Sequence, residues 1–500
     1  IRKHFPEGTT VWVPEGGFLL WVELPQQVDI EGAYDAALEK NVAFSRGKAF
    51  YTTPEAEFGA MRINCSRPTM VELVQGIEIL GDILSKLVRP ENSSSIRVTN
   101  GMHNPERLPP GDPVKLGLDP NRLVLLHRGI RRFVDRGQHA GIAIMLVREG
   151  KVVDTFEAGF RHLEVAIPMT RDTIVRIYSM TKIVVSVAAL TLLERGELGL
   201  LDPVTDYLPE FRDTKVFVGG TAKDPELVFP QRPITIQHLF THTSGLIYEA
   251  PNEPIDEFYQ ALYERGAKTL EELVNCVARL PLKWHPGTRF AYGFSTDVLG
   301  RVIEVVSGQR LDQYLKEHLF EPLNMVDTRY SVDAARQDRL AKIYEHGRDG
   351  RLRAVTALRG ESTYGQRDFP QGGSGLFSTL DDYAQFAQML CNRGELEGNR
   401  FIGRKTWELM VANHLTIAAV PFNDLALGHG FGLGVAVRID DGAAGTLGTM
   451  NAFGWTGMAT TYCRIDPEER LVALCFTQHL PYDEHSLFQR FANLAYQTLA

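Results

Sequence analysis

Ser179 and Lys182 are the two residues of this chain whose types and spacing best suit covalent chemistry. They begin and end the motif Ser-Met-Thr-Lys, which directly precedes the apolar run 183–193. Side chains three positions apart on a helix lie on one face, so the lysine amine can reach the serine hydroxyl. A serine hydroxyl becomes a good nucleophile only when a neighbouring base takes its proton, and a buried lysine can be that base. Because the start of a helix also aims backbone N–H groups at this spot, the motif predicts an acyl-transfer nucleophile.

The four-residue spacing alone does not identify a site. Ser45 and Lys48 repeat it in a polar stretch around Gly47, with no apolar helix behind them. An isolated Ser-x-x-Lys is most often structural, with the serine capping a helix and the lysine lying on its surface. Context must therefore decide between the two copies, and it favours Ser179.

Tyr292 follows on a loop shaped by Pro286 and Gly287, directly before a helical pattern at 296–306. A tyrosine near a lysine ammonium ionises more easily and can relay protons. A packed aromatic residue is the alternative interpretation of this position.

The segment Gly454-Trp-Thr-Gly457 leads into a strand-like run. Glycines at a strand edge let a substrate carbonyl approach backbone N–H groups closely, as an oxyanion hole requires. A plain hairpin turn would explain the same residues.

His242 and Ser244 suggest a serine–histidine pair at first sight. The two residues are two positions apart, a spacing at which side chains on a helix point away from each other. We interpret both as structural.

Composition narrows the function classes. The chain has 500 residues, of which 44% are hydrophobic and 23% charged, which is ordinary for a globular protein of two to three domains. A net charge of -9 argues against nucleic acid as a partner. No apolar run is long enough to span a membrane. The cysteines are scattered and never spaced as Cys-x-x-Cys, which argues against a disulfide framework or a zinc site: Cys65, Cys276, Cys391, Cys463 and Cys475.

The cysteine usage fits a reducing compartment, and no charged-then-apolar leader is visible at Ile1. We therefore expect a cytoplasmic protein.

Three segments follow from the pattern along the chain. Residues 1–88 predict a small α+β unit, with strands at 17–24 and 61–65 and helices at 29–40 and 68–88. Residues 89–117 are rich in Pro, Asn, Ser and Gly and predict a linker. Residues 118–500 form the third segment.

In this third segment, strand-like runs lie near both ends and helices lie between them. The strand-like runs are 140–147, 152–160, 431–437, 459–465 and 471–477, and the clearest helical patterns are 123–134, 183–196, 296–306, 381–390 and a final helix from about 485. This order predicts one antiparallel sheet built from both ends of the segment and flanked by a helical region.

Five motifs, in this order, make residues from 115 to 500 resemble the serine β-lactamase and penicillin-binding-protein superfamily, in its class C-like branch. They are Ser179-Met-Thr-Lys182, His238-Leu-Phe-Thr-His-Thr-Ser-Gly-Leu246, Pro286-Gly-Thr-Arg-Phe-Ala-Tyr292, Gly372-Gly-Ser-Gly-Leu-Phe-Ser-Thr-Leu380 with Asp381 and Asp382, and Trp455-Thr-Gly457. The resemblance implies an α/β (α+β) fold, an antiparallel sheet flanked by helices plus a helical region.

Two departures from the pattern of that branch bear on the substrate. The family motif Tyr-x-Asn is here Tyr292-Gly-Phe294, and the family motif Lys-Thr-Gly is here Trp455-Thr-Gly457. Both changes make the site more apolar and less suited to an anionic β-lactam. The chain is in this respect most similar to the family VIII carboxylesterases, whose apolar pocket would hold an ester.

The resemblance implies an acyl-enzyme mechanism without a metal or cofactor. Ser179 would attack a small ester, and Lys182 and Tyr292 would share its proton and pass it to the alcohol. The N–H groups of Ser179 and Met458 would stabilise the oxyanion. The residues expected to contact substrate are Trp455, Thr456, Gly457 and Phe294.

The segment 248–263, with Phe258 and Tyr259, leaves two interpretations open. It could form part of a substrate lid, or it could be an ordinary packed helix.

Residues 1–90 resemble something different, the C-terminal small domain of a fold-type I aminotransferase or of a MocR-type regulator. The resemblance rests on 14–25 and 58–66, in which Arg62 matches the arginine that grips a substrate carboxylate. The segment that would supply the Schiff-base lysine is absent, so we expect no pyridoxal-phosphate activity and a structural or surface role for Arg62. Standing alone, such a unit would expose an apolar face, which would dock on the hydrolase or drive homo-oligomerisation; the sequence leaves both open.

Other functions stay open at this point. A class C-type β-lactamase or a D-amino-peptidase would use the same serine. A non-catalytic penicillin-binding-like module would need neither Ser179, Lys182 nor Tyr292, so the presence of all three argues for an enzyme.

Overall fold

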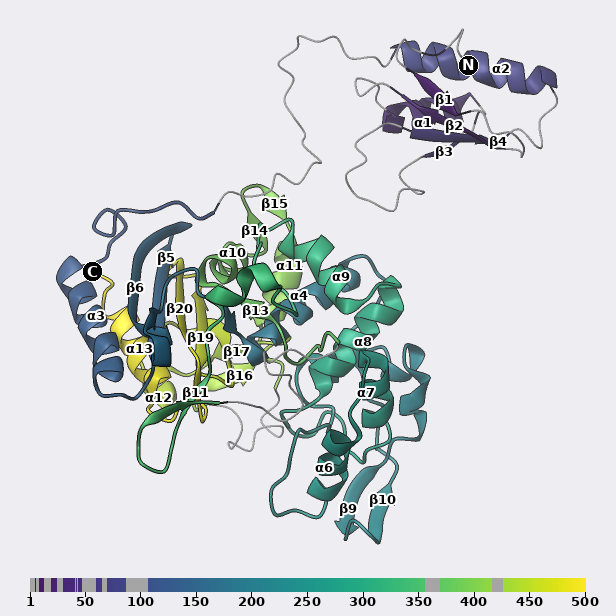
Figure 1. Cartoon of the computed structure of the whole chain (residues 1–500). Helices are drawn as coiled ribbons and strands as arrows, with labels where there is room; N and C mark the ends of the chain where they lie inside the picture. The colour runs from purple at the N-terminus through teal and green to yellow at the C-terminus, as the bar shows by residue number, and fades with distance from the viewer. Residues whose placement is uncertain are drawn as a thin grey trace. The chain divides into compact units, whose positions relative to one another are not determined.

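The computed structural model describes residues 5, 9–12, 19–24, 30–40, 42, 44–46, 60–64, 70–86, 107–355, 369–415 and 426–500. The chain divides into two compact units, Ile1–Asn100 and Gly101–Ala500 (Figure 1). Each is described by itself.

The first unit has an antiparallel sheet and two helices among its described residues. The strand order is β1-β2-β4-β3, with β1 Thr10–Trp12, β2 Leu19–Glu23, β4 Ala60–Asn64 and β3 Ser45–Arg46, and the helices are α1 Ile30–Glu39 and α2 Met70–Lys86. Val22 and Met61 pair across β2 and β4 and are fully buried with Ala33 and Leu84 of the helices. Lys48 and Cys65 lie outside the described residues, as do the side chains of Ser45 and Arg62.

The second unit is built on one antiparallel sheet. Among the described residues its strand order is β16-β17-β18-β19-β20-β5-β6-β7. The strands are β16 His429–Phe431, β17 Ala436–Arg438, β18 Phe453–Gly457, β19 Thr461–Asp466, β20 Leu471–Thr477, β5 Gly141–Arg148, β6 Lys151–His162 and β7 Ile167–Pro168. The early strand β5 pairs with the late strand β20, from Leu471↔Arg148 to Thr477↔Ile142. The predicted sheet formed from both ends of the segment is confirmed.

The two faces of the sheet are covered by different helices (Figure 1). Along β5 the side chains alternate, because successive residues of a strand point to opposite faces. Ile142, Ile144 and Leu146 pack with the helices α3 Pro120–Asp135 and α13 Leu487–Tyr496. The intervening residues of β5 pack on the other side, against the larger core that contains α4 Thr181–Glu194 and α10 Leu380–Cys391.

Helix α4 occupies the centre of this larger core. Its residues from Thr181 to Leu192 are all buried, which fits a helix that is apolar all round. The other helices and short strands surround it: α5 Ile236–Phe240, α6 Asp256–Arg265, α7 Leu270–Val277, α8 Ser295–Ser307, α9 Leu311–Leu315, α11 Arg404–Val411, α12 Asp441–Ala444, β8 Val175–Arg176, β9 Val216–Gly220, β10 Pro225–Val228, β11 Tyr344–His346, β12 Leu352–Ala354, β13 Phe377–Ser378, β14 Glu395–Leu396, β15 Asn399–Arg400 and β21 His479–Leu480.

Two sequence predictions need correction. Residues 107–117 do not belong to a linker, because Leu108 is buried in the larger core and the N–H of Gly111 donates to the carbonyl of Val152. The strand predicted at 431–437 is a hairpin of β16 and β17, whose turn has Gly434 at a φ of 84°. The continuous apolar pattern arose because both strands and their turn are buried.

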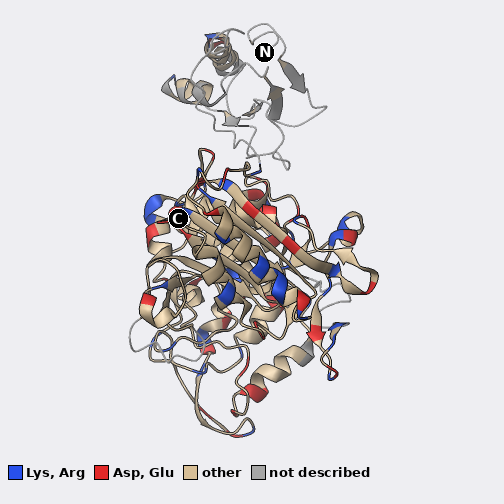
Figure 2. Ribbon diagram, turned by 90° about the vertical axis from the view of Figure 1, so that its left-hand side faces the viewer, with Lys and Arg blue, Asp and Glu red and all other residues tan. Residues whose placement is uncertain are grey.

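Charged residues of both signs are interspersed over the face of the second unit drawn in Figure 2. In the described parts of the chain, no helix combines the length and the apolar character that crossing a bilayer requires.

Candidate active site

Ser179 lies in a short 3-10 turn, Tyr178–Met180, that leads directly into α4. Tyr178 has a φ of 43°, in the left-handed region that a tyrosine rarely adopts. Such a conformation persists only where the surrounding packing holds it, and it occurs often at functional sites. Tyr178 and Met180 are buried, whereas Ser179 between them keeps partial exposure. The turn therefore presents the serine hydroxyl outward from a packed core.

Lys182 reaches this hydroxyl from the first turn of α4. Its ammonium lies 3.3 Å from Ser179 Oγ, 3.1 Å from the hydroxyl of Tyr248 and 2.7 Å from the carbonyl oxygen of Gly373. The side chain is only 1% exposed. The structure thus brings together the serine and the lysine of the predicted pair, and it adds two partners.

Tyr292 faces the same ammonium with its ring. Lys182 Nζ lies 4.6 Å from the centroid of the Tyr292 ring, within the range of a cation–π contact. The Tyr292 hydroxyl accepts a hydrogen bond from the indole N–H of Trp455, at 3.2 Å. Tyr292 therefore belongs to the site, and Trp455 on β18 fixes the position of its hydroxyl.

Tyr248, Asp297 and Gly373 form a network that the sequence analysis missed. The Tyr248 hydroxyl donates to Asp297 Oδ2 at 3.3 Å, and the N–H of Gly373 donates to Asp297 Oδ1 at 2.9 Å. Burial, with a smaller contribution from Asp297, raises the pKa of Tyr248 well above its usual value. Tyr248 therefore remains protonated, so that it donates to Asp297 and accepts from Lys182.

Two sequence signals could have pointed to this network. Tyr248 stands two residues after Leu246, the end of one superfamily-like motif, and Gly373 lies inside another.

Tyr259 belongs to the segment 248–263, for which a lid and a packed helix were both open. It packs in the core, and its hydroxyl donates to the carbonyl of Pro281 at 3.0 Å, as the packed-helix interpretation predicts.

His242 packs against the ring of Tyr292. Its ring lies 4.7 Å from the Tyr292 ring, and its nitrogens lie 3.4 Å from the N–H of Gly293 and from Thr296 Oγ1. Burial, together with the charge of Lys182, holds the pKa of His242 well below its usual value, so that the ring is neutral. Ser244 shares a hydrogen bond with Ser295 at 2.8 Å. Both residues have structural contacts, in line with the sequence interpretation.

Strand β18 lies against the turn that carries Ser179. A Cβ added at Gly457 would be 2.4 Å from the carbonyl oxygen of Ile177 and 2.2 Å from Thr461 Oγ1, so that only glycine fits at this distance. Met458 follows in the tight turn between β18 and β19, in which the N–H of Thr460 donates to the carbonyl of Gly457. The hairpin turn thus comes directly after the 454–457 segment. The oxyanion role of the Ser179 and Met458 N–H groups stays a prediction.

The predicted substrate-contacting residues have different surroundings. Trp455 and Thr456 are half-buried, and Thr456 Oγ1 lies 2.8 Å from the hydroxyl of Tyr482. Phe294 is only 5% exposed and packs with its ring against Tyr248. The substrate role of Phe294 stays a prediction, and its observed contact supports Tyr248 from the core.

Comparison with known proteins finds a matching family model and several relatives. The family model described as Beta-lactamase matches residues 126–496. An uncharacterized protein of Mycobacterium tuberculosis is 34% identical over 363 residues, which cover 70% of this chain and 89% of that protein. Esterase EstB of Burkholderia gladioli is 29% identical over 343 residues, which cover 64% of this chain and 80% of the esterase.

A solved structure extends the likeness to three dimensions. That of EstCE1, described as a hydrolase with promiscuous acyltransferase activity, superposes with a TM-score of 0.63 and 25% identity, covering 75% of this chain and 99% of EstCE1. The predicted superfamily and fold are confirmed. The aminotransferase-like character of residues 1–90 stays a prediction, because the family match begins at residue 126.

Proposed function

The chain belongs to the Beta-lactamase family, and from this membership and the geometry around Ser179 we propose that it is a serine carboxylesterase for small esters with short acyl groups. The observation that carries the proposal is the approach of Lys182 Nζ to Ser179 Oγ, at 3.3 Å. The esterase and acyl-transferring relatives support the same reaction class, in which a serine is acylated.

The contacts of Lys182 suit a proton acceptor. A neutral amine has two N–H bonds and one lone pair. The carbonyl of Gly373 and the hydroxyl of Tyr248 can take the two N–H bonds, which leaves the lone pair for the Ser179 proton. The ammonium formed by that transfer keeps all three contacts as a donor. The proton can therefore move to Lys182 and back without rearrangement of the side chain.

The reaction follows in two halves. Ser179 Oγ bonds to the ester carbonyl carbon while its proton passes to Lys182. The tetrahedral intermediate then expels the alcohol, which takes that proton with Tyr292 as the relay. Water repeats the sequence on the acyl-enzyme, with the same groups first removing and then returning a proton. The N–H groups of Ser179 and Met458 would bind the oxyanion in both halves.

Trp455 favours an ester over a β-lactam. It supplies an uncharged indole next to Tyr292, whereas the lactamase motif supplies a lysine. An anionic substrate therefore meets no positive charge at this position. The runner-up functions, a β-lactamase or a D-amino-peptidase, would need that charge for recognition. Hydrolysis of p-nitrophenyl butyrate faster than hydrolysis of nitrocefin would support the esterase, and the reverse order would contradict it.

The direct test is Ser179→Ala, with Ser45→Ala as a matched control from the second Ser-x-x-Lys motif. We expect Ser179→Ala to abolish hydrolysis of p-nitrophenyl butyrate and labelling by a fluorophosphonate probe, with an unchanged circular dichroism spectrum. Ser45→Ala should retain both. Undiminished turnover in Ser179→Ala would refute the assignment, and a wild-type protein that neither turns over nor labels would support the non-catalytic module.

The acyl group on Ser179 could be transferred to an alcohol instead of water. This reaction is tested separately, because EstCE1 is described as a hydrolase with promiscuous acyltransferase activity. Product analysis in the presence of methanol distinguishes the two acceptors. Formation of methyl butyrate at the expense of butyrate would add acyl transfer to the activity. Butyrate alone would restrict the enzyme to hydrolysis.

A further inference from the structure

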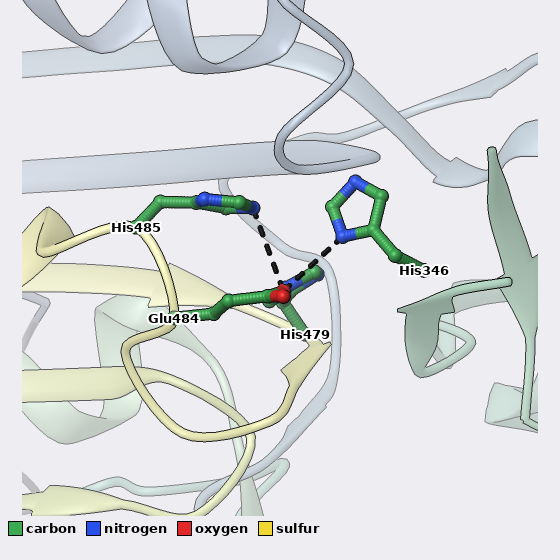
Figure 3. Close-up of side chains that lie close together, drawn as sticks. All are labelled: His346, His479, Glu484 and His485. Atoms are coloured by element: carbon green, nitrogen blue, oxygen red, sulfur yellow. Dashed lines mark hydrogen bonds and ion pairs between the residues drawn. The ribbon is translucent and has the colours of Figure 1, made fainter. Parts of the chain in front are cut away.

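Four side chains far from Ser179 in the sequence converge at one place in the second unit (Figure 3). His346 ends β11, His479 begins β21, and Glu484 and His485 lie in the loop before α13. One nitrogen of each histidine and one oxygen of Glu484 all lie within 4.8 Å of one another. None of these residues takes part in the proposed esterase reaction.

The distances in this cluster resemble those between the ligands of a tetrahedral metal ion. Glu484 Oε2 lies 2.9 Å from His479 Nε2, 3.1 Å from His346 Nδ1 and 3.5 Å from His485 Nε2. In a tetrahedral zinc site, metal–ligand distances of about 2.0–2.1 Å place neighbouring ligand atoms about 3.4 Å apart. The three distances to Glu484 are therefore close to those between zinc ligands, and the histidine nitrogens, which lie within 4.8 Å of one another, would move closer together around an ion.

The contacts of His346 give a second reason. Its Nε2 lies 3.1 Å from the carbonyl oxygen of Gly137, which can only accept, so Nε2 carries a proton. Its other nitrogen, Nδ1, faces Glu484 Oε2 at 3.1 Å. A histidine that donates its second N–H to a carbonyl is also the usual arrangement around a bound metal ion.

Two histidine nitrogens of this region lack a hydrogen bond. Among the described residues, the solvent-shielded Nε2 of His139 has no hydrogen-bond partner, and that of His485 has only its 3.5 Å ion-pair contact with Glu484. The His139 ring lies 4.6 Å from that of His479, which has no exposed surface. Three histidines thus surround the Glu484 carboxylate, and a fourth, His139, packs against the ring of His479.

We propose that His346, His479, His485 and Glu484 bind a divalent transition-metal ion, with Zn²⁺ as the preferred metal. Three imidazole nitrogens and one carboxylate oxygen suit Zn²⁺, whereas Mg²⁺ and Ca²⁺ prefer oxygen ligands throughout. Four protein ligands complete a tetrahedron and leave no position for substrate, so the site is structural.

The ion would connect two elements that already pair. β11 runs parallel to β21 through Tyr344↔His479, and the ion adds the loop that carries Glu484 and His485. In that loop the N–H of Asp483 donates to Thr460 Oγ1, in the turn that follows β18. Metal binding would therefore stabilise the second unit and hold this loop next to the strand that borders the active site.

The experiment uses the full chain, purified through a tag without histidine, treated with a chelator and titrated with Zn²⁺ against a chromophoric competitor. We expect one equivalent of Zn²⁺ per chain and a higher thermal midpoint, since Zn²⁺ at about a hundred times its Kd shifts the unfolding equilibrium about a hundredfold. Co²⁺ in its place should give the intense visible absorption of a tetrahedral site.

His346→Gln and His485→Gln are the test variants, because both side chains are partly exposed and the metal-free fold should tolerate them. Each should weaken Zn²⁺ binding at least tenfold and lose the thermal shift. His127→Gln is the control, because it breaks a single histidine–carboxylate pair, with Asp154, at 2.9 Å. Wild-type Zn²⁺ affinity in both test variants, or no stoichiometric binding by the wild type, would overturn the proposal.

Discussion

Trp455 donates its indole N–H to the hydroxyl oxygen of Tyr292, across 3.2 Å. The two rings also pack together, with centroids 5.5 Å apart. Trp455 stands where the lactamase-like motif has its lysine, so a neutral donor replaces a cation beside Tyr292. Trp455 supplies a hydrogen bond to the proposed relay residue without the charge that would attract an anionic substrate.

Trp455→Phe should therefore lower kcat for p-nitrophenyl butyrate with little change in KM. The substitution keeps an aromatic ring against Tyr292 but removes the donor. A hydrogen bond contributes about 1 kcal/mol, so we expect kcat to fall about three- to tenfold. Steady-state kinetics over a range of acyl lengths provides the measurement.

Trp407→Phe is the matched control, because Trp407 also donates its indole N–H, to the carbonyl of Leu390 at 2.8 Å, but in the core. It should lower the thermal midpoint and leave kcat unchanged. Equal losses of kcat in the two variants would show that the effect of Trp455 is one of general stability.

Tyr248 and Tyr292 should differ in their effect on catalysis. Tyr292→Phe removes the proposed proton relay and should reduce kcat about 10²–10⁴-fold. Tyr248→Phe removes the hydroxyl that joins Lys182 to Asp297. Because hydrogen bonds to charged groups contribute about 1.5–3 kcal/mol, we expect a loss of about 10–10²-fold.

The comparison needs a readout that separates positioning from stability. Tyr314→Phe loses a buried hydroxyl contact with Thr191, at 2.8 Å, and should change only the thermal midpoint. A larger loss of kcat in Tyr248→Phe than in Tyr292→Phe would reverse the roles that we assign to the two tyrosines.

The sequence predicted the parts of the site that depend on local pattern. Ser179 and Lys182 lie within one turn of chain, and the apolar run after them forms a buried helix, so their contact follows from the spacing and the apolar run together. Tyr292 and Trp455 were predicted from the order of the five superfamily-like motifs, although each residue by itself was ambiguous.

The rest of the site could not be predicted because it depends on the packing of distant elements. Tyr248 contacts Lys182 within a network that also contains Asp297, in the first turn of α8, and the loop around Gly373. The contact therefore depends on segments that lie far apart in the sequence. The proposed metal site was missed for a similar reason. Cysteine spacing argued against zinc, while His346 and His479 become neighbours only through the pairing of β11 with β21.

Gly457→Ala should impair catalysis through the backbone. Its new Cβ would lie 2.4 Å from the carbonyl oxygen of Ile177, which belongs to the main chain and cannot turn away. Strand β18 must then move away from the Ser179 turn, and a displacement of about 1 Å in a catalytic site can cost about 10²-fold in rate. We expect kcat to fall at least tenfold. Gly442→Ala is the control, since the nearest atom to its added Cβ is 3.5 Å away, and it should retain full activity.

The last prediction concerns the pH dependence of stability, through Asp382 in the first turn of α10. Its Oδ2 accepts from the N–H of Asp327 at 2.7 Å and from Thr328 Oγ1 at 2.9 Å, while Oδ1 is buried without a hydrogen-bond partner among the described residues. Burial raises the pKa of Asp382 to about 6, from an ordinary value of 3.8, with a smaller raising effect from the charge of Asp327.

The sign follows from proton linkage. Between the two pKa values the folded state holds a proton on Asp382 and the unfolded state does not, so the contribution of this group to stability is present in acid and is lost as the pH rises through about 6. Asp382→Asn does not titrate, and its amide can still accept at one end. The free energy of unfolding of the variant minus that of the wild type should therefore increase by about 2 kcal/mol between about pH 4.5 and about pH 7.5.

Urea unfolding of both proteins at the two pH values measures this difference. The other titrating groups are common to both proteins, so their contributions to the free energy of unfolding cancel in the difference. Asp135→Asn is the control for the substitution itself, because its carboxyl lies exposed at the end of α3. A pH-independent difference for Asp382→Asn would mean that Asp382 is as well solvated in the folded chain as in the unfolded one, and that water reaches its Oδ1.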